Sequence, residues 1–200
     1  MMTSTPIYQL KISVKGITPP IWRRVLMPAD VTFRALHETI QLALGWSDGH
    51  LHEFATEKRN GMYIEGKITD LKTLDGADPW GEPPADERKV KLNERLSKAK
   101  DRLAYSYDFG DSWEHEILLE KILVRDKEID YPVCIAGKRI CPPEDCGGIG
   151  GYERMLFVLK NPKHPEHGEM LEWLGIDRAE DFDPEEFDVD TTNGLLRDGY

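Results

Sequence analysis

The sequence has little cysteine, and nothing in it is typical of a secreted or membrane-spanning protein. Only Cys134, Cys141 and Cys146 occur in 200 residues, and an odd set within one short stretch does not resemble a secreted disulfide framework. No apolar run approaches the roughly twenty residues that span a bilayer, and the N-terminus has no basic and apolar signal region. We therefore expect a cytoplasmic protein without membrane contact, whose cysteines are reduced thiols or metal ligands.

Positive charge is also scarce. Asp and Glu number 37 against 26 Lys and Arg, which gives a net charge of −11 at pH 7. Such a charge repels phosphate backbones, so we do not expect specific nucleic-acid binding. One basic stretch, within 88–102, contains Arg88, Lys89, Lys91, Arg95, Lys98, Lys100 and Arg102. It has no interleaved aromatic side chains for base stacking, and such runs are usually a solvated surface.

Signatures of nucleophilic catalysis are missing as well. The chain has no G-x-S-x-G elbow, no H-E-x-x-H helix and no cysteine-protease signature. The string DFG at 108–110 is not accompanied by a glycine-rich phosphate loop or an HRD-type catalytic loop, so a kinase is excluded. No residue is therefore indicated as a nucleophile.

The composition is that of a folded globular protein. Apolar residues make up 40% and charged residues 32% of the chain, which is far from a disordered composition. A chain of this length suits one domain, which we assign to residues 1–200.

Hydrophobic periodicity predicts a β-β-α opening. Apolar and polar residues alternate over 8–14, and a second strand is predicted over 21–27. Thr32 is a suitable N-cap for a helix that reaches Leu44 and stops at Gly45. A further strand is expected from His50 to Ala55 with Tyr63-Ile64 in its partner, followed by a surface loop over 75–87.

The clearest predicted hairpin lies within 103–119. A three-residue turn at 110–112 places Phe109 opposite Trp113 and Tyr107 opposite His115. A two-residue turn would lose the match between the two apolar faces. We therefore predict the three-residue turn.

That register also predicts an acidic site. It places Asp108 opposite Glu114 with Asp111 at the turn, and like charges in such a pair need a neutralising partner. An arginine, Arg23 or Arg24, is the favoured partner, ahead of a magnesium or calcium ion.

The last third of the chain is predicted to be helical. One helix carries an apolar stripe over 152–159, and a second contains 170–174. Asp183 followed by Pro184 predicts the start of a third. The expected fold class is α+β, an antiparallel β-sheet with hairpins packed by one helix of the N-terminal half and a helical C-terminal region.

Three histidines are candidate metal ligands. His50 and His52 lie two residues apart on a predicted strand, so their side chains point to the same side. With His115 from the hairpin they could bind zinc and leave an open position for water, as catalytic sites do. In the alternative interpretation, each imidazole lines the rim of the core and bonds a backbone group or a tyrosine.

A second set of residues has a looser zinc-ligand pattern. Cys141 and Cys146 precede His164 and His167, but the interval between the pairs exceeds the usual finger spacing and contains a predicted helix. Reduced, partly buried thiols are the favoured interpretation.

Several motifs resemble those of the plasmid pRiA4b ORF-3-like family, from Tyr8 to about Leu196. They are PPIWRRVLMP, TFRALHETIQLALGW, HLHEF, YSYDFGDSWEHEI, CPPEDCGGIGGYE and FDPEEFD with Asn193. The resemblance implies a plasmid or mobile-element setting but no established reaction. It also implies that a pocket, if present, gathers the recurrent motif positions. These are His50, His52, Asp108, Asp111, Trp113, His115, Cys141, Glu144 and Asp145, to which the hairpin adds Glu114.

Two functional hypotheses follow. The first is a non-catalytic binding or interaction module with a protein or small-molecule partner. The alternative is a metal-dependent hydrolase that uses the three histidines and the hairpin acids, with zinc as the most plausible cofactor. In either case Trp22, Trp46 and Trp113 are expected to be largely buried.

Overall fold

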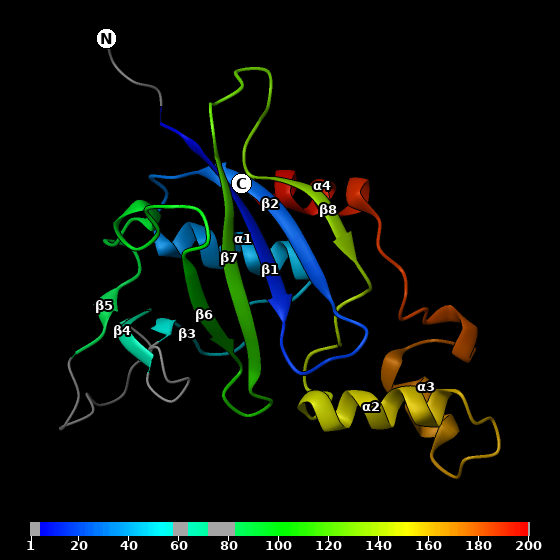
Figure 1. Ribbon diagram of the computed structural model, residues 1–200. Helices are drawn as coiled ribbons and strands as arrows, with labels where there is room; N and C mark the ends of the chain where they lie inside the picture. Colours follow the sequence, from blue (N-terminus) through cyan, green and yellow to red (C-terminus); the bar gives the residue numbers. More distant parts are fainter. Residues whose placement is uncertain (1–4, 58–63, 72–82, 200) are drawn as a thin grey trace.

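The protein is described here by a computed structural model, which covers residues 5–57, 64–71 and 83–199. One eight-stranded sheet runs through these residues in the order β5-β4-β3-β6-β7-β1-β2-β8 (Figure 1). The strands are β1 (Ile7–Val14), β2 (Trp22–Pro28), β3 (His52–Glu57), β4 (Ile64–Thr69), β5 (Ala85–Asp86), β6 (Arg102–Tyr107), β7 (Trp113–Leu123) and β8 (Val133–Lys138). Every pairing is antiparallel except that of β4 with β5. The expected α+β class is therefore confirmed.

Four α-helices accompany the sheet in the described part of the chain. They are α1 (Phe33–Leu44), α2 (Gly148–Leu159), α3 (His167–Leu174) and α4 (Val189–Asp198), with two short 3-10 turns at Leu92–Glu94 and Ala179–Asp181. Figure 1 shows α1 crossing behind the central strands, while α2 and α3 lie beyond one end of the sheet. None of the helices among these residues is both long and apolar enough to cross a bilayer.

Local signals set the boundaries of α1 as the sequence predicts. The Thr32 side chain accepts a hydrogen bond from the Ala35 N–H at 3.3 Å. Gly45 has φ 80° and donates its N–H to the carbonyl of Gln41, which is a conformation that glycine adopts without a Cβ clash. The helix packs its buried stripe, including Phe33 and Ile40, against the sheet.

The predicted hairpin exists, but its register is different. Tyr107 lies opposite Trp113 and Tyr105 opposite His115, so the turn contains five residues, 108–112, rather than three. Because the shift is two residues, the apolar faces still coincide. Asp108 stabilises the longer turn, since its Oδ1 accepts the Gly110 N–H at 2.9 Å and its carbonyl accepts the Ser112 N–H.

The new register removes the acidic pair that was expected. Glu114 lies opposite Ser106, whose hydroxyl donates to its carboxylate at 2.7 Å. Neither candidate arginine reaches the hairpin acids. Arg23 is buried and donates to the carbonyl of Ala43, while Arg24 pairs with Glu120.

The second face of the sheet carries no helix among the described residues. Trp22 lies on this face and is only half-buried. The cationic groups of Lys11 and Arg24 lie 5.1 and 5.0 Å from its ring. The expectation that it is buried was therefore wrong, because strand alternation turns its neighbour Ile21 into the core instead. Trp46 and Trp113 are buried as expected.

The helix predicted at Asp183 is also wrong. The Asp183 carboxylate accepts the Glu185 N–H in a single turn, and the last helix starts later, at Val189. There the side chain of Asp188 is the cap and accepts the Thr191 N–H at 2.6 Å. Between the two positions, Phe187 packs on Arg23, whose guanidinium lies 4.5 Å from the centre of the phenyl ring.

Two other predictions concern the edge of the sheet. Tyr63 lies outside the described residues, while Ile64 begins β4, the partner of β3. Most of the loop expected over 75–87 is likewise outside them. Its end is not an exposed loop, because 85–86 forms β5 and the Glu87 side chain is fully buried.

Candidate functional site

Three segments distant in sequence meet at one end of the sheet, and we call them the loop end. They are 46–51 before β3, the β6–β7 turn at 108–112, and 141–147 before α2. Hydrogen bonds join them. The Trp46 indole donates to the Pro142 carbonyl at 3.0 Å, and the Gly147 N–H donates to Asp111 Oδ2 at 3.1 Å. In Figure 1 the β6–β7 turn lies beside the start of α2.

Glu144 connects the loop end to the core. Its carboxylate accepts hydrogen bonds from the Ser47 hydroxyl at 2.6 Å, the Ser47 N–H at 3.1 Å and the Tyr107 hydroxyl at 2.5 Å. Burial and this acidic partner raise the pKa of Tyr107. Trp46 stacks on the Tyr107 ring at 4.9 Å, so the segment is fixed by both polar and aromatic contacts.

His50, Asp108 and Asp145 form a group at the surface of the loop end. His50 precedes β3 rather than lying on it. Its Nδ1 is 3.8 Å from Asp108 Oδ2, and its Nε2 is 3.4 Å from Asp145 Oδ1. One donor atom from each residue lies within 4.8 Å of the other two, so the three could share a cation.

His52 belongs to a different, buried group. Its ring stacks on that of His37, with the ring centres 3.5 Å apart and the ring planes inclined by 9°. Its Nε2–H donates to Glu87 Oε2 at 2.6 Å. His37 donates to Asp48 Oδ1 at 2.7 Å and accepts from the Tyr105 hydroxyl at 2.8 Å. Burial, together with the neighbouring His52 ring, lowers the pKa of His37 to about 4.

One possible ligand atom from each of His37, Asp48 and His52 also lies within 4.8 Å of the other two, which is close enough for a shared metal ion. The parallel stack argues against a shared ion, because a metal bound in the plane of one ring would lie far out of the plane of the other. We therefore interpret this group as a hydrogen-bonded network beneath the surface.

His115 is enclosed in the core. Its Nδ1–H donates to the Tyr105 carbonyl at 3.1 Å, and its Nε2 has no hydrogen-bond partner. Burial lowers the pKa of this imidazole to about 4. The donor atoms of His50, His52 and His115 do not form one group within 4.8 Å. The structure thus divides the three predicted ligands among three environments.

The remaining predicted pocket residues are only partly brought together. Asp111, Glu144 and Asp145 lie at the loop end, whereas Glu114 bonds Ser106 on the sheet and Trp113 is 1% exposed in the core with no partner for its indole N–H. Cys141 is buried too. It therefore cannot line an open pocket.

The two cysteines and two histidines of the looser zinc pattern do not meet as a metal group. His167 donates to the Val158 carbonyl at 3.0 Å, and His164 accepts the Glu166 N–H. Burial raises the pKa of Cys146 to about 11 and that of Cys141 further. Both groups are therefore thiols at neutral pH.

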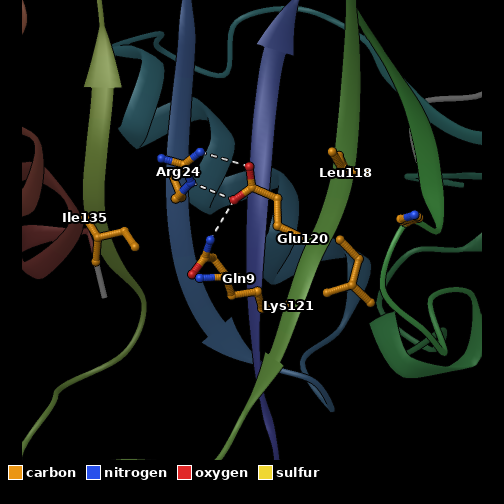
Figure 2. A pocket seen from close by; sticks show the side chains of 8 residues that line it. Gln9, Arg24, Leu118, Glu120, Lys121 and Ile135 are labelled. Atoms are coloured by element: carbon orange, nitrogen blue, oxygen red, sulfur yellow. Dashed lines mark hydrogen bonds and ion pairs between the residues drawn. The ribbon is translucent and has the colours of Figure 1, made fainter.

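Two of the hollows among the described residues differ in chemistry. The larger, about 650 Å³, lies on the open face of the sheet. Figure 2 shows why we do not regard it as the site: Gln9 and Arg24 converge on the Glu120 carboxylate and satisfy it with three hydrogen bonds of 2.6–2.9 Å.

The smaller hollow, about 390 Å³, adjoins the loop end, and we call it the recess. Its lining consists of Arg34, Asp48, Gly49, His50, Leu51, His52 and Asp70. It lies against both histidine groups, since His50 of the surface group and Asp48 and His52 of the buried group line it. Its volume falls within the usual range for small-molecule sites.

Sequence reasoning missed three residues beside the recess: His37, Asp48 and Glu87. His37 had a recognisable signal, because it lies on the same helical stripe as Phe33 and Ile40 and is a polar residue among apolar ones. Glu87 had none, since its burial depends on β5 and on the docking of distant segments.

Comparison with known proteins identifies similar chains. A sequence model described as plasmid pRiA4b ORF-3-like protein matches residues 6–191. An uncharacterized protein of Sinorhizobium fredii is 35% identical over 173 residues, which cover 84% of this chain and 81% of that protein. A crystal structure of a protein of unknown function from Methanosarcina mazei has 42% identity and a TM-score of 0.78, with 93% of this chain and 97% of that chain covered.

Proposed function

Because the chain belongs to the plasmid pRiA4b ORF-3-like family, we propose that it is an accessory binding module of plasmid or mobile-element origin that holds a small polar ligand in the recess. The family description supports the plasmid setting. Three free cysteines support a reducing compartment, such as the cytosol.

The observation that carries the proposal is the recess itself. Ligand sites combine a concave surface with a few fixed polar groups. Here Arg34, which lines the hollow, is fixed by ion pairs with Glu38 at 2.6 Å and Asp48 at 3.0 Å. Gly49 lines it as well and leaves backbone accessible, while its N–H donates to the Tyr107 hydroxyl at 3.1 Å. These groups are preorganised, so binding would cost little ordering entropy.

The polar groups favour an uncharged or zwitterionic ligand. Arg34 is balanced by three carboxylates, the third being Glu87 at 3.6 Å, and Asp70 forms a two-point ion pair with Arg88 at 2.7 Å. A ligand with one unbalanced charge would compete with these pairs.

Binding is better supported than hydrolysis. The hydrolase alternative needed His50, His52 and His115 on one metal ion, and their separation gives it no support. The cysteine thiols are protonated at neutral pH, and His37 is neutral with both ring nitrogens engaged. None of these groups therefore supplies an activated nucleophile.

The test is a ¹H–¹⁵N spectrum recorded with mixtures of amino acids, nucleosides and sugars. We expect the amide signals of Asp48, Gly49 and Leu51 to shift in a saturable way with at least one compound class. Gly49→Leu should block this response by filling the recess, since a Cβ at this position contacts only the Ser47 hydroxyl at 3.4 Å.

Gly168→Leu is the matched control, because a Cβ there meets nothing within 4 Å. It should leave the response unchanged. Shifts confined to the hollow around Glu120, or shifts that persist in Gly49→Leu, would contradict the proposal.

A further inference from the structure

We propose that His50, Asp108 and Asp145 bind a divalent transition-metal ion, of which Zn²⁺ is the best match, at the rim of the recess. This inference goes beyond the proposed function and does not depend on it, because the cation can bind whether or not the recess holds an organic ligand. It differs from the three-histidine site that the sequence predicted, and it retains only His50.

The three side chains converge from segments that are distant in the sequence. His50 precedes β3, Asp108 begins the β6–β7 turn, and Asp145 precedes α2. The Nε2 of His50 and Oδ1 of Asp145 are 3.4 Å apart, which is about the 3.3 Å between two donors of a tetrahedral zinc site with bonds of about 2.0 Å. It is too long for a good hydrogen bond.

In Asp108, one carboxylate oxygen accepts hydrogen bonds and the other accepts none from the described residues. Oδ1 accepts the N–H groups of Gly110 and Asp111 at 2.9 and 3.3 Å. Oδ2 accepts no hydrogen bond from the described residues and lies 3.8 Å from Nδ1 of His50. One nitrogen of His50 and one oxygen of each aspartate lie within 4.8 Å of one another, which is the set a single ion would use. Oδ2 is therefore a free ligand atom on a side chain whose other oxygen holds it in place.

The group carries negative charge that no arginine or lysine among the described residues balances. Asp108 and Asp145 bring two carboxylates to one imidazole, and among the described residues each has an ion-pair contact only with His50. Arginine and lysine therefore do not neutralise the group. A divalent ion would do so, and one imidazole with two carboxylates is a donor set for zinc and related ions rather than for magnesium or calcium.

Backbone hydrogen bonds hold the three ligand-bearing segments against one another. The Asp108 N–H donates to the Leu51 carbonyl at 2.9 Å and so connects the turn to the segment that carries His50. The Gly147 N–H donates to Asp111 and holds the Asp145 segment against the same turn. Three ligands on segments connected in this way leave a fourth position of a tetrahedral ion open toward solvent, since Asp145 is 74% exposed.

The experiment uses protein dialysed against a chelator and then titrated with ZnCl₂ alone by calorimetry and thermal unfolding. We expect one equivalent of zinc to bind and to raise the unfolding temperature with zinc excess. His50→Gln and Asp145→Asn should each weaken binding by at least about tenfold. Both positions are at the surface, so the metal-free variants should keep the wild-type unfolding temperature.

His164→Gln is the matched control, because His164 is a partly exposed histidine away from the group. It should bind zinc like the wild type. If zinc does not bind saturably at about 1 mM, or if only His164→Gln weakens binding, the assignment is wrong. The organic-ligand test on Gly49→Leu is read without zinc, so the two proposals fail separately.

Discussion

Two buried neutral histidines should make the stability of this protein fall between pH 7 and pH 4.5. His37 and His115 are both 0% exposed, and burial lowers the pKa of each to about 4. In the unfolded chain each would have a pKa of about 6.5. Between these values the unfolded state binds more protons than the folded state, so stability is complete above pH 6.5 and is lost as pH falls toward 4.

The magnitude follows from the two pKa values. A histidine that shifts from about 6.5 to about 4 loses about 2 kcal/mol between pH 7 and pH 4.5, and two such residues lose about 4–5 kcal/mol. That is a large part of the 5–15 kcal/mol typical of a domain. Carboxyl groups with lowered pKa, such as Glu120, lose their contribution mainly below this window, so pH 4.5 is the lower limit of the test.

The assay is urea unfolding followed by tryptophan fluorescence at pH 7, 5.5 and 4.5. His115→Phe removes one titrating group and should reduce the pH dependence by about half, whatever its effect on stability at pH 7. His164→Gln should behave like the wild type. A wild-type free energy of unfolding that changes by less than about 1 kcal/mol over this range would refute the burial of two neutral imidazoles.

Three other predictions concern packing and charge. Trp113→Ala should lower the free energy of unfolding by about 3–5 kcal/mol, because the indole is 1% exposed; a loss below about 1 kcal/mol would place it outside the core. Gly151→Ala should cost about 2 kcal/mol or more, since a Cβ would lie 1.8 Å from the Cys146 carbonyl oxygen. In the same helix Gly150→Ala, which meets nothing within 4 Å, should be neutral or stabilising, and equal losses in an unfolding titration would contradict this reasoning. Labelled duplex DNA should show no sequence-specific binding by anisotropy at physiological salt, and changing Lys89 to Glu should make no difference; specific binding would show that a local surface overrides the net charge of −11.

Features that depend on nearby residues could be predicted from the sequence. Helix α1 begins and ends where Thr32 and Gly45 indicate, because a capping side chain and a left-handed glycine act within one turn. The strand at 7–14 follows its alternation for the same reason.

The hairpin register could not be fixed in this way. Apolar alternation has a period of two, so it cannot distinguish registers that differ by two residues. Asp108 favours the observed register, because its carboxylate accepts the N–H groups of Gly110 and Asp111 in the five-residue turn. The predicted pairing with Glu114 was lost as a result.

The site itself depends on tertiary contacts. His50 and His52 are neighbours in the chain, yet one meets Asp145 from the region before α2 and the other stacks on His37 of α1. The sequence indicates which residue types could bind a ligand. Only the docking of distant segments decides which of them share a site.

The measurement that tests the account most directly is a ¹H–¹⁵N spectrum with Co²⁺, a paramagnetic ion that binds nitrogen and oxygen ligands much as zinc does. We propose that the loop end is the ligand-binding end of this protein. One equivalent of Co²⁺ should then broaden the amide signals of Leu51, Asp108 and Asp145 first, and His50→Gln should abolish the effect. Broadening centred on Glu120 or His164, with the loop-end signals unchanged, would contradict it.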